Sequence, residues 1–357
     1  MESLFWFAVA LVAYVYFGYP LLLAVWSALA GRQRSSPSRL VGDADAPGIT
    51  VVVAARNEGR RLPARIDNIL ASEYPQDRLQ IIVASDGSTD NTVEALAPYR
   101  NRITLLPLPP TGKAGALNAA IDEAAHPLLV FADARQRFAP DAIRRLVSHF
   151  EDPAIGAVSG ELILDGRGST VADGVGAYWT YEKWLRRHEA TVGSTLGVTG
   201  AIYAMRRSLW RPLPPDTILD DVMAPMRVVL AGFRVTFDAL AHAYDETAAD
   251  ASAELRRKSR TLAGNYQLLA REPRLLVPIA NPVWLQFMSH KVGRLVVPYA
   301  LVATLAASAW LAPSSMFYAL AFAVQLGFYG LAAYGALLDS RMKHRPAKAR
   351  EVIREAA

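Results

Sequence analysis

The sequence predicts an α/β domain with a parallel, doubly wound sheet over residues 48–274, flanked by segments long and apolar enough to span a membrane. Two observations predict the sheet. Short β-branched runs alternate with helix-like segments, and three such runs, within residues 50–58, 81–90 and 127–133, lead into polar or acidic turns. Open α/β sheets bind ligands at the carboxyl ends of their strands, so we expect a site there for a hydroxyl-rich, phosphate-bearing ligand.

The elements of this domain follow from local patterns. Apolar runs of strand length predict strands over 51–54, 81–84, 103–106, 128–132 and 157–164, and a further strand after a loop at 197–200. Helical spacing predicts helices over 60–71, 91–97, 113–124, 141–150, 178–188 and 220–231. The aromatic and basic helix 178–188 either packs against the domain or forms part of an acceptor channel near the membrane. The segment Asp86-Gly-Ser after the second strand either forms only a turn or contributes its carboxylate to the site.

Two adjacent carboxylates, Asp220 and Asp221, stand at the start of the last predicted helix, which ends before Gly232. One acid at this position is explained by helix capping, an effect of about 1 kcal/mol. Either both residues only cap the helix, or one of them has a chemical role. Two adjacent acids exceed what capping needs, which favours the chemical role.

Residues 1–31 are predicted to form a first membrane helix, because no charged residue occurs from Ser3 to Gly31 and about 20 apolar residues span a bilayer. A cleaved signal peptide is the alternative, but Glu2 in place of a basic cluster and the length of the run favour a retained anchor. Residues 295–338 are also uncharged and contain a Pro-Ser turn, which predicts two further spans.

The segments between and beyond the spans set the predicted topology. Residues 32–47 are predicted to form a polar linker, residues 275–294 an interfacial helix with a fourth span as the alternative, and residues 339–357 a basic tail. Basic residues follow the first and last spans, so the positive-inside rule places the domain and the tail in the cytoplasm and the N-terminus outside. The sequence thus predicts a multi-pass protein of the inner (plasma) membrane.

The composition excludes several classes of protein. The chain has no cysteine, which excludes disulfides, thiolate catalysis and thiolate metal sites. The net charge is +5, its basic clusters flank the predicted spans, and the motifs at the strand ends are acidic. Nucleic-acid binding therefore has little support.

Taken in order, the motifs resemble those of the membrane-bound family 2 glycosyltransferases, the branch that includes cellulose and hyaluronan synthases. They are Ala55-Arg-Asn-Glu58, Asp86-Gly-Ser, Gly-Lys113-Ala-Gly-Ala-Leu-Asn118, Asp133 and Asp220-Asp221. The resemblance covers about residues 48 to 265. It implies the GT-A fold, a Rossmann-like nucleotide-diphospho-sugar transferase domain, and an inverting enzyme that uses a UDP-sugar with Mg²⁺ or Mn²⁺.

The resemblance assigns residues to the donor site by position. Ala55 and Glu58 would lie against the uracil and the ribose, and Asp86 would hold the base or the ribose. Lys113 and Asn118 would line the rest of the donor site.

The resemblance also divides the acidic roles. Asp133 matches the first acid of the Asp-x-Asp motif that binds the metal, and Asp221, beside Asp220, matches the general base. Arg135 stands where the second acid is expected, and a guanidinium cannot ligate a metal. Either Asp133 binds the ion with water and another group, or Arg135 itself supplies positive charge to the diphosphate.

A second departure lies at Arg257-Lys-Ser-Arg260-Thr261, where processive synthases carry Gln-x-x-Arg-Trp. Arg260 is retained as a diphosphate contact, with Arg257 as a second candidate. The missing Trp and the small number of spans disfavour processive extrusion of a polymer. The alternative is that this basic cluster is a solvated or lipid-facing surface.

The resemblance implies sugar transfer to a saccharide acceptor in exopolysaccharide or cell-surface glycan synthesis. Two alternatives stay open. The first is transfer to a polyprenyl-phosphate or other lipid acceptor. The second is a sugar-nucleotide-binding subunit without catalysis, which the absence of the second acid would favour. The presence of Asp86 and Asp221 favours catalysis.

Overall fold

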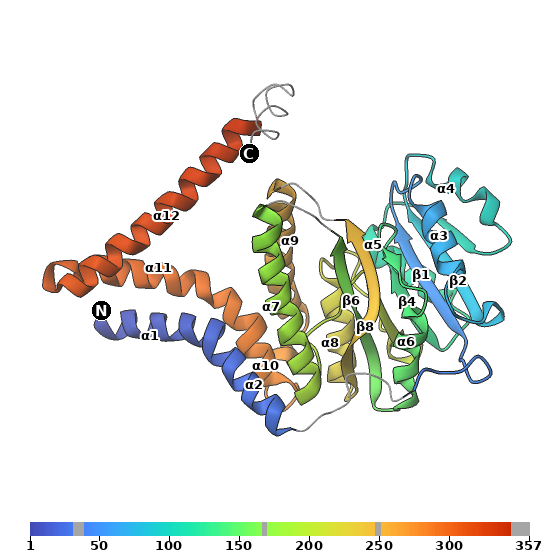
Figure 1. Cartoon of the computed structure of the whole chain (residues 1–357), viewed down its shortest axis with the longest axis horizontal. Helices are drawn as coiled ribbons and strands as arrows, with labels where there is room; N and C mark the ends of the chain where they lie inside the picture. Colours follow the sequence, from blue (N-terminus) through green and yellow to red (C-terminus); the bar gives the residue numbers. More distant parts are fainter. Residues whose placement is uncertain (31–38, 166–169, 247–250, 344–357) are drawn as a thin grey trace. The chain divides into compact units, whose positions relative to one another are not determined.

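The computed structural model describes residues 1–30, 39–165, 170–246 and 251–343 (Figure 1). Part of the predicted linker, residues 32–38, and most of the predicted basic tail, residues 344–357, lie outside the described residues. The chain divides into two compact units, one formed by residues 1–18 with 293–357 and the other by residues 19–292.

An eight-stranded sheet organises the unit of residues 19–292, with strand order β3-β2-β1-β4-β7-β6-β8-β5. The strands are β1 (Ile49–Ala55), β2 (Leu79–Asp86), β3 (Thr104–Leu108), β4 (Leu128–Ala132), β5 (Arg137–Phe138), β6 (Ile155–Asp165), β7 (Ile202–Arg206) and β8 (Arg234–Glu246). The first four strands in this order are parallel, so β1, β2 and β4 end at the same edge.

The prediction of a parallel sheet is wrong at β7, which pairs antiparallel with both β4 and β6. A single crossover helix would have kept the next strand parallel. Here the chain from β4 to β7 passes through β5, α6, β6 and α7, so it re-enters the sheet in the opposite direction.

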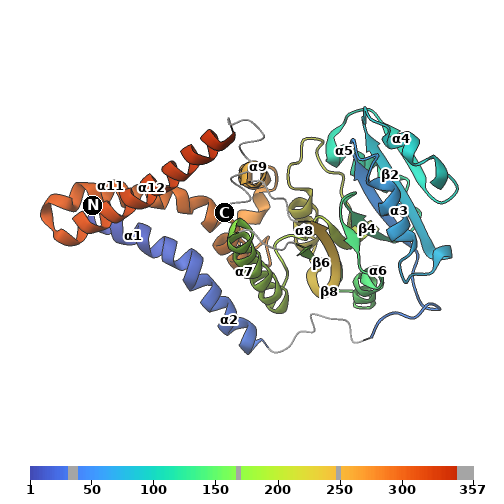
Figure 2. The same ribbon diagram turned by 45° about the horizontal axis from the view of Figure 1, so that its top comes forward.

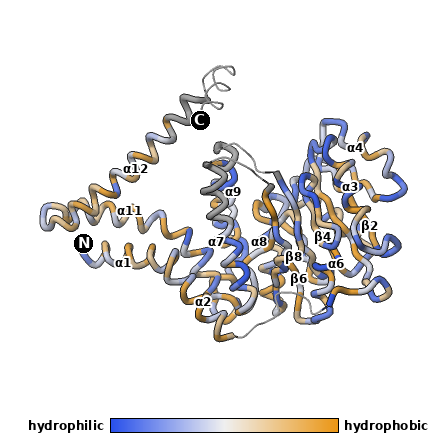
Figure 3. The backbone as a smooth tube through the Cα atoms, in the orientation of Figure 1, coloured by the Kyte–Doolittle hydropathy of each residue, from blue (hydrophilic) through white to orange (hydrophobic). Residues whose placement is uncertain are grey.

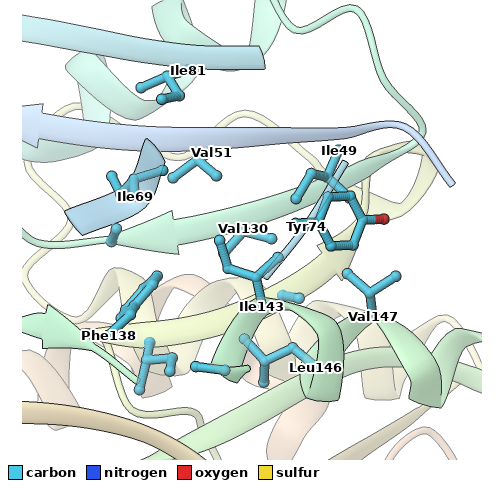
Figure 4. Packing of buried hydrophobic residues seen from close by; sticks show 14 of the residues in the cluster. Ile49, Val51, Ile69, Tyr74, Ile81, Val130, Phe138, Ile143, Leu146 and Val147 are labelled. Atoms are coloured by element: carbon cyan, nitrogen blue, oxygen red, sulfur yellow. The ribbon is translucent and has the colours of Figure 1, made fainter. Parts of the chain in front are cut away.

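Helices cover both faces of the sheet (Figure 2). The helices of this unit, including those that do not touch the sheet, are α2 (Tyr19–Leu29), α3 (Leu62–Leu70), α4 (Thr92–Ala95), α5 (Gly112–Asp122), α6 (Ala142–Ser148), α7 (Thr170–Val192), α8 (Asp220–Leu230), α9 (Ala251–Arg271) and α10 (Trp284–Gln286). The apolar side chains of α3 and α6 pack on one face, against Val51, Ile81 and Val130 (Figure 4). Those of α5 and α8 pack on the other face, against Val52 and Phe131.

Three of the strands and helices named above were not predicted: β5, which has only two residues, β8 and α9. β8 was missed because its sequence carries Asp and His among small residues, so neither alternation nor an apolar run marks it as a strand. α9 was missed because its sequence is dominated by charged and polar residues. α7 extends well beyond the predicted 178–188 helix.

The other unit contains α1 (Glu2–Ala13), α11 (Gly293–Leu311) and α12 (Met316–Lys343). Phe5 of α1 packs edge-to-face on Tyr318 of α12, with 5.1 Å between ring centroids. Among the residues that the structure describes, three helical segments are long and apolar enough to cross a membrane: Glu2–Leu29, Trp284–Ser314 and Met316–Gly335 (Figure 3). The chain is accordingly a membrane protein.

The second of these segments begins inside the stretch predicted as a separate interfacial helix. α10 continues through a π-helical turn, Phe287–Val292, directly into α11. No glycine or proline precedes Gly293 within this segment to end the helix there, so the predicted boundary at 294–295 does not coincide with a break in the backbone.

Candidate active site

The site is built from the loops that follow β1, β2 and β4 at their shared edge. The first two loops are joined by side chain–backbone hydrogen bonds. The backbone N–H of Thr89 donates to Asn57 Oδ1 (2.8 Å), and that of Glu58 donates to Thr92 Oγ1 (3.0 Å). Asn57 has a φ of 56°, a conformation that Asn tolerates better than most residues. Ala55 is buried at the end of β1, and Glu58 forms an ion pair with Arg61 at 2.8 Å.

Asp86 holds the start of α5 against this edge. Its Oδ1 accepts hydrogen bonds from the backbone N–H groups of Thr111 (2.6 Å) and Gly112 (3.0 Å). The intervening turn requires glycine at position 87, because its φ is +59° and an added Cβ would lie 2.8 Å from Pro110. The helix start is thereby fixed, and with it the next residue, Lys113.

Lys113 connects two acids that are far apart in the sequence. Its Nζ lies 3.2 Å from Asp133 Oδ1, just beyond β4, and 3.2 Å from Asp220 Oδ2, at the start of α8. Burial by itself lowers the pKa of Lys113, but the nearby charges of Asp220, Asp133 and Asp221 outweigh it and raise the pKa above its usual value. The ammonium group therefore stays protonated between the two carboxylates.

The adjacent acids of α8 are not explained by capping alone. Leu219 occupies the N-cap position, and no side chain forms a capping hydrogen bond at this helix. The Asp220 side chain is only 7% exposed and pairs with Lys113. Burial and the neighbouring charge of Asp220 raise the pKa of Asp221 to about 6. Asp221 thus has the proton affinity of a general base at near-neutral pH.

A glycine loop packs against Asp221. The backbone N–H of Val198 donates to the Asp221 carbonyl oxygen at 2.8 Å. A Cβ added at Gly200 would lie 3.2 Å from Asp221 Oδ2, so a larger residue there would crowd the carboxylate. Sequence reasoning identified residues 197–200 only as a loop, although two glycines within four residues were a signal of close backbone approach.

Tyr203 is a second residue that sequence reasoning missed. It lies on β7, stacks on Phe131 with 4.2 Å between ring centroids, and is almost fully buried. Its hydroxyl has no hydrogen-bond partner among the described residues. Burial, followed by the charges of Asp220, Asp221 and Asp133, raises the pKa of this phenol well above its usual value. Tyr203 therefore stays neutral beneath the acids.

Arg135 forms an ion pair that the sequence did not predict. It donates to Asp245 Oδ2 of β8 at 2.5 Å, and Gln136 donates to the same oxygen at 2.9 Å. The Asp245 side chain is 3% exposed whereas that of Arg135 is 53% exposed, so a buried acid holds an accessible guanidinium. β8 itself was not predicted, and Asp245 gave no signal in the sequence.

Asn118, a predicted donor-site residue, forms two hydrogen bonds with the backbone of Leu213. Its Nδ2 donates to the Leu213 carbonyl (2.8 Å) and its Oδ1 accepts from the Leu213 N–H (2.9 Å). Both ends of the amide are therefore used to hold the segment that leads to α8.

We expect Asn118→Ala to destabilise the folded protein by about 1–3 kcal/mol, because it leaves the backbone groups of Leu213 without these partners. Thermal unfolding in detergent measures the loss. Asn101→Ala, at an exposed turn position, serves as the control and is expected to leave the midpoint unchanged. Equal midpoints for the two variants would contradict the role of Asn118.

α9 braces the segment before Asp220. Arg260 donates to the Ile218 carbonyl at 3.2 Å, and Gln267 Oε1 accepts from the Ile218 N–H at 2.9 Å. Arg260 therefore contacts a residue two positions before Asp220. Arg257 lies on an exposed part of the same helix, and its contact with substrate stays a prediction, as does that of Arg260.

A large surface hollow lies at the other edge of the sheet. It is lined by residues that include Pro127 and Leu128 at the start of β4 and Arg206 at the end of β7. Asp133 follows the opposite end of β4, so this hollow is separate from the cluster of acids.

The comparison with protein families decides the classification. Residues 50–211 match the model of glycosyl transferase family 2. These residues form a family 2 glycosyltransferase domain. The match includes Glu58, Asp86, Lys113 and Asp133, and it ends before Asp221.

Solved structures support the fold of this glycosyltransferase domain. A mannosyltransferase from Pyrobaculum calidifontis, solved with GDP-Man and Mn²⁺, is 25% identical, with a TM-score of 0.68 and coverage of 94% of this chain and 92% of that one. The GT-A fold with flanking membrane helices is thereby confirmed.

Curated relatives share the glycosyltransferase domain. Poly-beta-1,6-N-acetyl-D-glucosamine synthase of Staphylococcus aureus is 25% identical over 240 residues, which cover 63% of this chain and 56% of the relative. Beta-monoglucosyldiacylglycerol synthase of Synechocystis is 25% identical over 248 residues, which cover 65% of this chain and 51% of that relative. The chain spans about half the length of these two relatives.

Proposed function

We propose that this protein is an inverting glycosyltransferase that transfers a sugar from a nucleotide-sugar, with a UDP-sugar as the first candidate, to a saccharide acceptor in exopolysaccharide or cell-surface glycan synthesis. The observation that carries the proposal is the Lys113 ammonium between Asp133 and Asp220, beside an acid with a raised pKa. The family 2 domain and the names of the relatives support it.

Asp221 would serve as the general base. In an inverting transfer, one carboxylate removes the proton of the acceptor hydroxyl while its oxygen attacks the anomeric carbon in line with the leaving diphosphate. A pKa of about 6 leaves most of Asp221 unprotonated at pH 7 while keeping it basic enough to accept a proton. Asp220 would keep Lys113 in place and, through its charge, keep the pKa of Asp221 high.

The donor diphosphate would lie at Asp133, Lys113 and Arg135. The described residues contain no group of three or more His, Cys, Asp or Glu side chains placed to hold a metal by themselves. A Mg²⁺ or Mn²⁺ ion shared between one carboxylate and the substrate phosphates needs no such group, and the Asp133 side chain is 39% exposed and accessible to it. The residues therefore fit a metal that arrives with the donor, and such an ion would neutralise charge on the leaving diphosphate.

Arg135 would compensate for the missing second acid. Asp245 holds the Arg135 guanidinium, and Arg135 follows Asp133 by two residues at the end of β4, so Arg135 would be able to contact the donor phosphates. We expect Arg135→Gln to weaken donor binding by about 10-fold, the loss of one charged hydrogen bond, with unchanged metal dependence. Donor affinity, measured by titration in detergent, checks this.

The matched control for Arg135 is Arg137→Gln, which lies two residues further along and stacks over Tyr244 at 4.9 Å. It is expected to bind donor as the unmodified protein does. Arg135→Asp, which restores the usual acid, is expected to lower donor affinity at low metal concentration. Unchanged activity and metal dependence in Arg135→Asp would contradict the role of Arg135.

The membrane topology is part of the proposal. The three apolar helices support a multi-pass protein of the inner membrane. Arg32 and Arg39 after the first span favour a cytoplasmic catalytic domain, where nucleotide-sugars are made. A lipid acceptor is the second candidate, because one of the relatives is named as a glucosyldiacylglycerol synthase.

The test of the function is nucleoside diphosphate release by the full chain in detergent, with UDP- and GDP-sugars screened in Mg²⁺ and in Mn²⁺. Metal-dependent release that Asp221→Asn abolishes is the expected result, and the most active donor identifies the sugar. Donor binding without turnover, in the presence of saccharide and lipid acceptors, would support the non-catalytic alternative.

A further inference from the structure

The loop 197–200 holds Asp221 through its backbone. The Val198 N–H donates to the Asp221 carbonyl oxygen at 2.8 Å, and a Cβ added at Gly200 would lie 3.2 Å from Asp221 Oδ2. Gly197 has a φ of +147°, a conformation that residues with a side chain rarely adopt. Because two of its four residues are glycines, the loop needs contacts with other elements to fix its conformation. The position of the Asp221 carboxylate depends on those contacts.

Thr199 has the only polar side chain among these four residues, and it connects the loop to two other elements. Its backbone N–H donates to Ser159 Oγ of β6 at 2.9 Å, and its Oγ1 accepts a hydrogen bond from Arg186 Nη1 of α7 at 2.9 Å. Ser159 is fully buried and Thr199 is 7% exposed, so these hydrogen bonds are shielded from water. Val198 is buried in the apolar core beside α8. The loop is therefore held by a strand, a helix and the core.

Arg186 differs from two cations beside it on α7. Lys183 and Arg187 form ion pairs with Glu161 of β6, at 2.8 Å and 2.9 Å. The Arg186 guanidinium donates to a hydroxyl of the loop. These side chains together fasten α7 to the domain, and the contact of Arg186 is the one that leads toward Asp221.

The end of α7 is anchored to other helices. Glu189 is fully buried, and its Oε1 accepts a hydrogen bond from the Tyr19 hydroxyl of α2 at 2.9 Å. The same oxygen lies 2.7 Å from His290 Nδ1, in the π-helical turn before α11, and His290 Nε2 lies 3.5 Å from Glu182 Oε2. α7 is therefore a fixed support for the loop.

We propose that Arg186 and Thr199 are positioning residues for Asp221. Through their hydrogen bond α7 holds the loop, and the loop holds the carboxylate where it meets the acceptor hydroxyl. This inference rests on the proposed function and adds to it the elements that set the geometry of the base. A displacement of about 1 Å in a reacting group can lower a rate by about 10²-fold, so a single hydrogen bond behind the base has a measurable effect.

The first test is Thr199→Val in the full chain in detergent. Valine has the shape of threonine and keeps the N–H that donates to Ser159, but it lacks the hydroxyl that accepts from Arg186. We expect kcat of sugar transfer to fall by about 10-fold or more, with donor affinity unchanged because Asp133 and Lys113 are not disturbed. Donor titration and steady-state transfer measure the two quantities.

Two further variants separate positioning from general damage. Thr199→Ser keeps the hydroxyl and is expected to keep most of the rate. Thr191→Val is the matched control, because the Thr191 hydroxyl donates to the Arg187 carbonyl within α7, and its kcat is expected to equal that of the unmodified protein. A fall in donor affinity that matches the fall in rate, or a serine variant as slow as the valine variant, would overturn the proposal.

A double-mutant cycle connects the loop to α7. Arg186→Gln and Thr199→Val remove the two ends of one hydrogen bond, so the double variant is expected to be about as slow as the slower single variant. Arg187→Gln, which loses its contact with Glu161 instead, is expected to combine with Thr199→Val multiplicatively. A loss of rate in Arg186→Gln without one in Thr199→Val would assign Arg186 an effect of charge on Asp221 and overturn the positioning role.

The outcome is separable from that of the proposed function. Normal transfer by Thr199→Val would reject the positioning role and leave the transferase in place. Absence of transfer by the unmodified protein would reject the function and, with it, a base that needs to be positioned.

Discussion

Replacing Asp221 with asparagine is expected to lower the rate of sugar transfer by about 10²–10⁴-fold, the usual contribution of a general base. Donor binding is expected to change little, because Asp133 and Lys113 remain in place. The measurement is steady-state transfer together with a donor titration. A variant with normal transfer would exclude Asp221 as the base.

The pH profile of the unmodified enzyme provides a second test of Asp221. Its pKa is raised to about 6, and the base acts only after it has lost its proton. The rate is therefore expected to rise as the pH increases from about 5 to about 7, with a midpoint near 6, and then to level off. The control is Asp77→Asn, an exposed acid before β2, which is expected to keep this profile.

Replacing Lys113 with glutamine is expected to have the second largest effect, a loss of about 10²-fold or more in donor turnover. The variant leaves Asp133 and the buried Asp220 without their shared cation, and it removes a positive charge from the donor site. Donor affinity and turnover are measured together, because a charge that contacts the diphosphate affects both.

Lys113→Gln also makes a directional prediction for pH. Because the positive charge of Lys113 lowers the pKa of Asp221, its removal raises that pKa and moves the acidic limb of the profile to higher pH. Lys183→Gln removes a lysine that pairs with Glu161 instead, and is expected to leave the limb in place. A limb that stays fixed in Lys113→Gln would show that the two groups are not coupled.

The sequence allowed one half of the site to be predicted. Asp86, Lys113 and Asp133 follow strands or begin a helix at one edge of the sheet, and parallel strands bring such residues together. Their geometric relation to Asp220 also depends on α8, which the hydrophobic spacing marked correctly. The structure brings several of the predicted residues together, but the roles assigned to all of them, Ala55, Glu58, Arg257 and Arg260 included, stay predictions.

The other half depends on contacts between elements that local patterns do not connect. Asp245 lies on β8, which has no strand-like alternation, and it meets Arg135 from 110 residues away in sequence. His290 of the turn 287–292 meets Glu182 and Glu189 of α7, a contact that no spacing in the sequence predicts. β7 is antiparallel to β4 because of the path that the chain takes between them. The local sequence pattern of a strand does not contain its direction in the sheet.

The buried contacts of Glu189 limit how this protein can be shortened for study. The predicted catalytic domain, residues 48–274, excludes both Tyr19 and His290, which share Glu189 Oε1. A fragment cut at those bounds would lose both hydrogen-bond partners of Glu189 and would expose the apolar side chains of α7 that pack against Tyr19 and Leu23. The smallest fragment that retains the compact unit runs from Tyr19 to Val292, so it carries the ends of two of the apolar segments, and we expect it to require detergent.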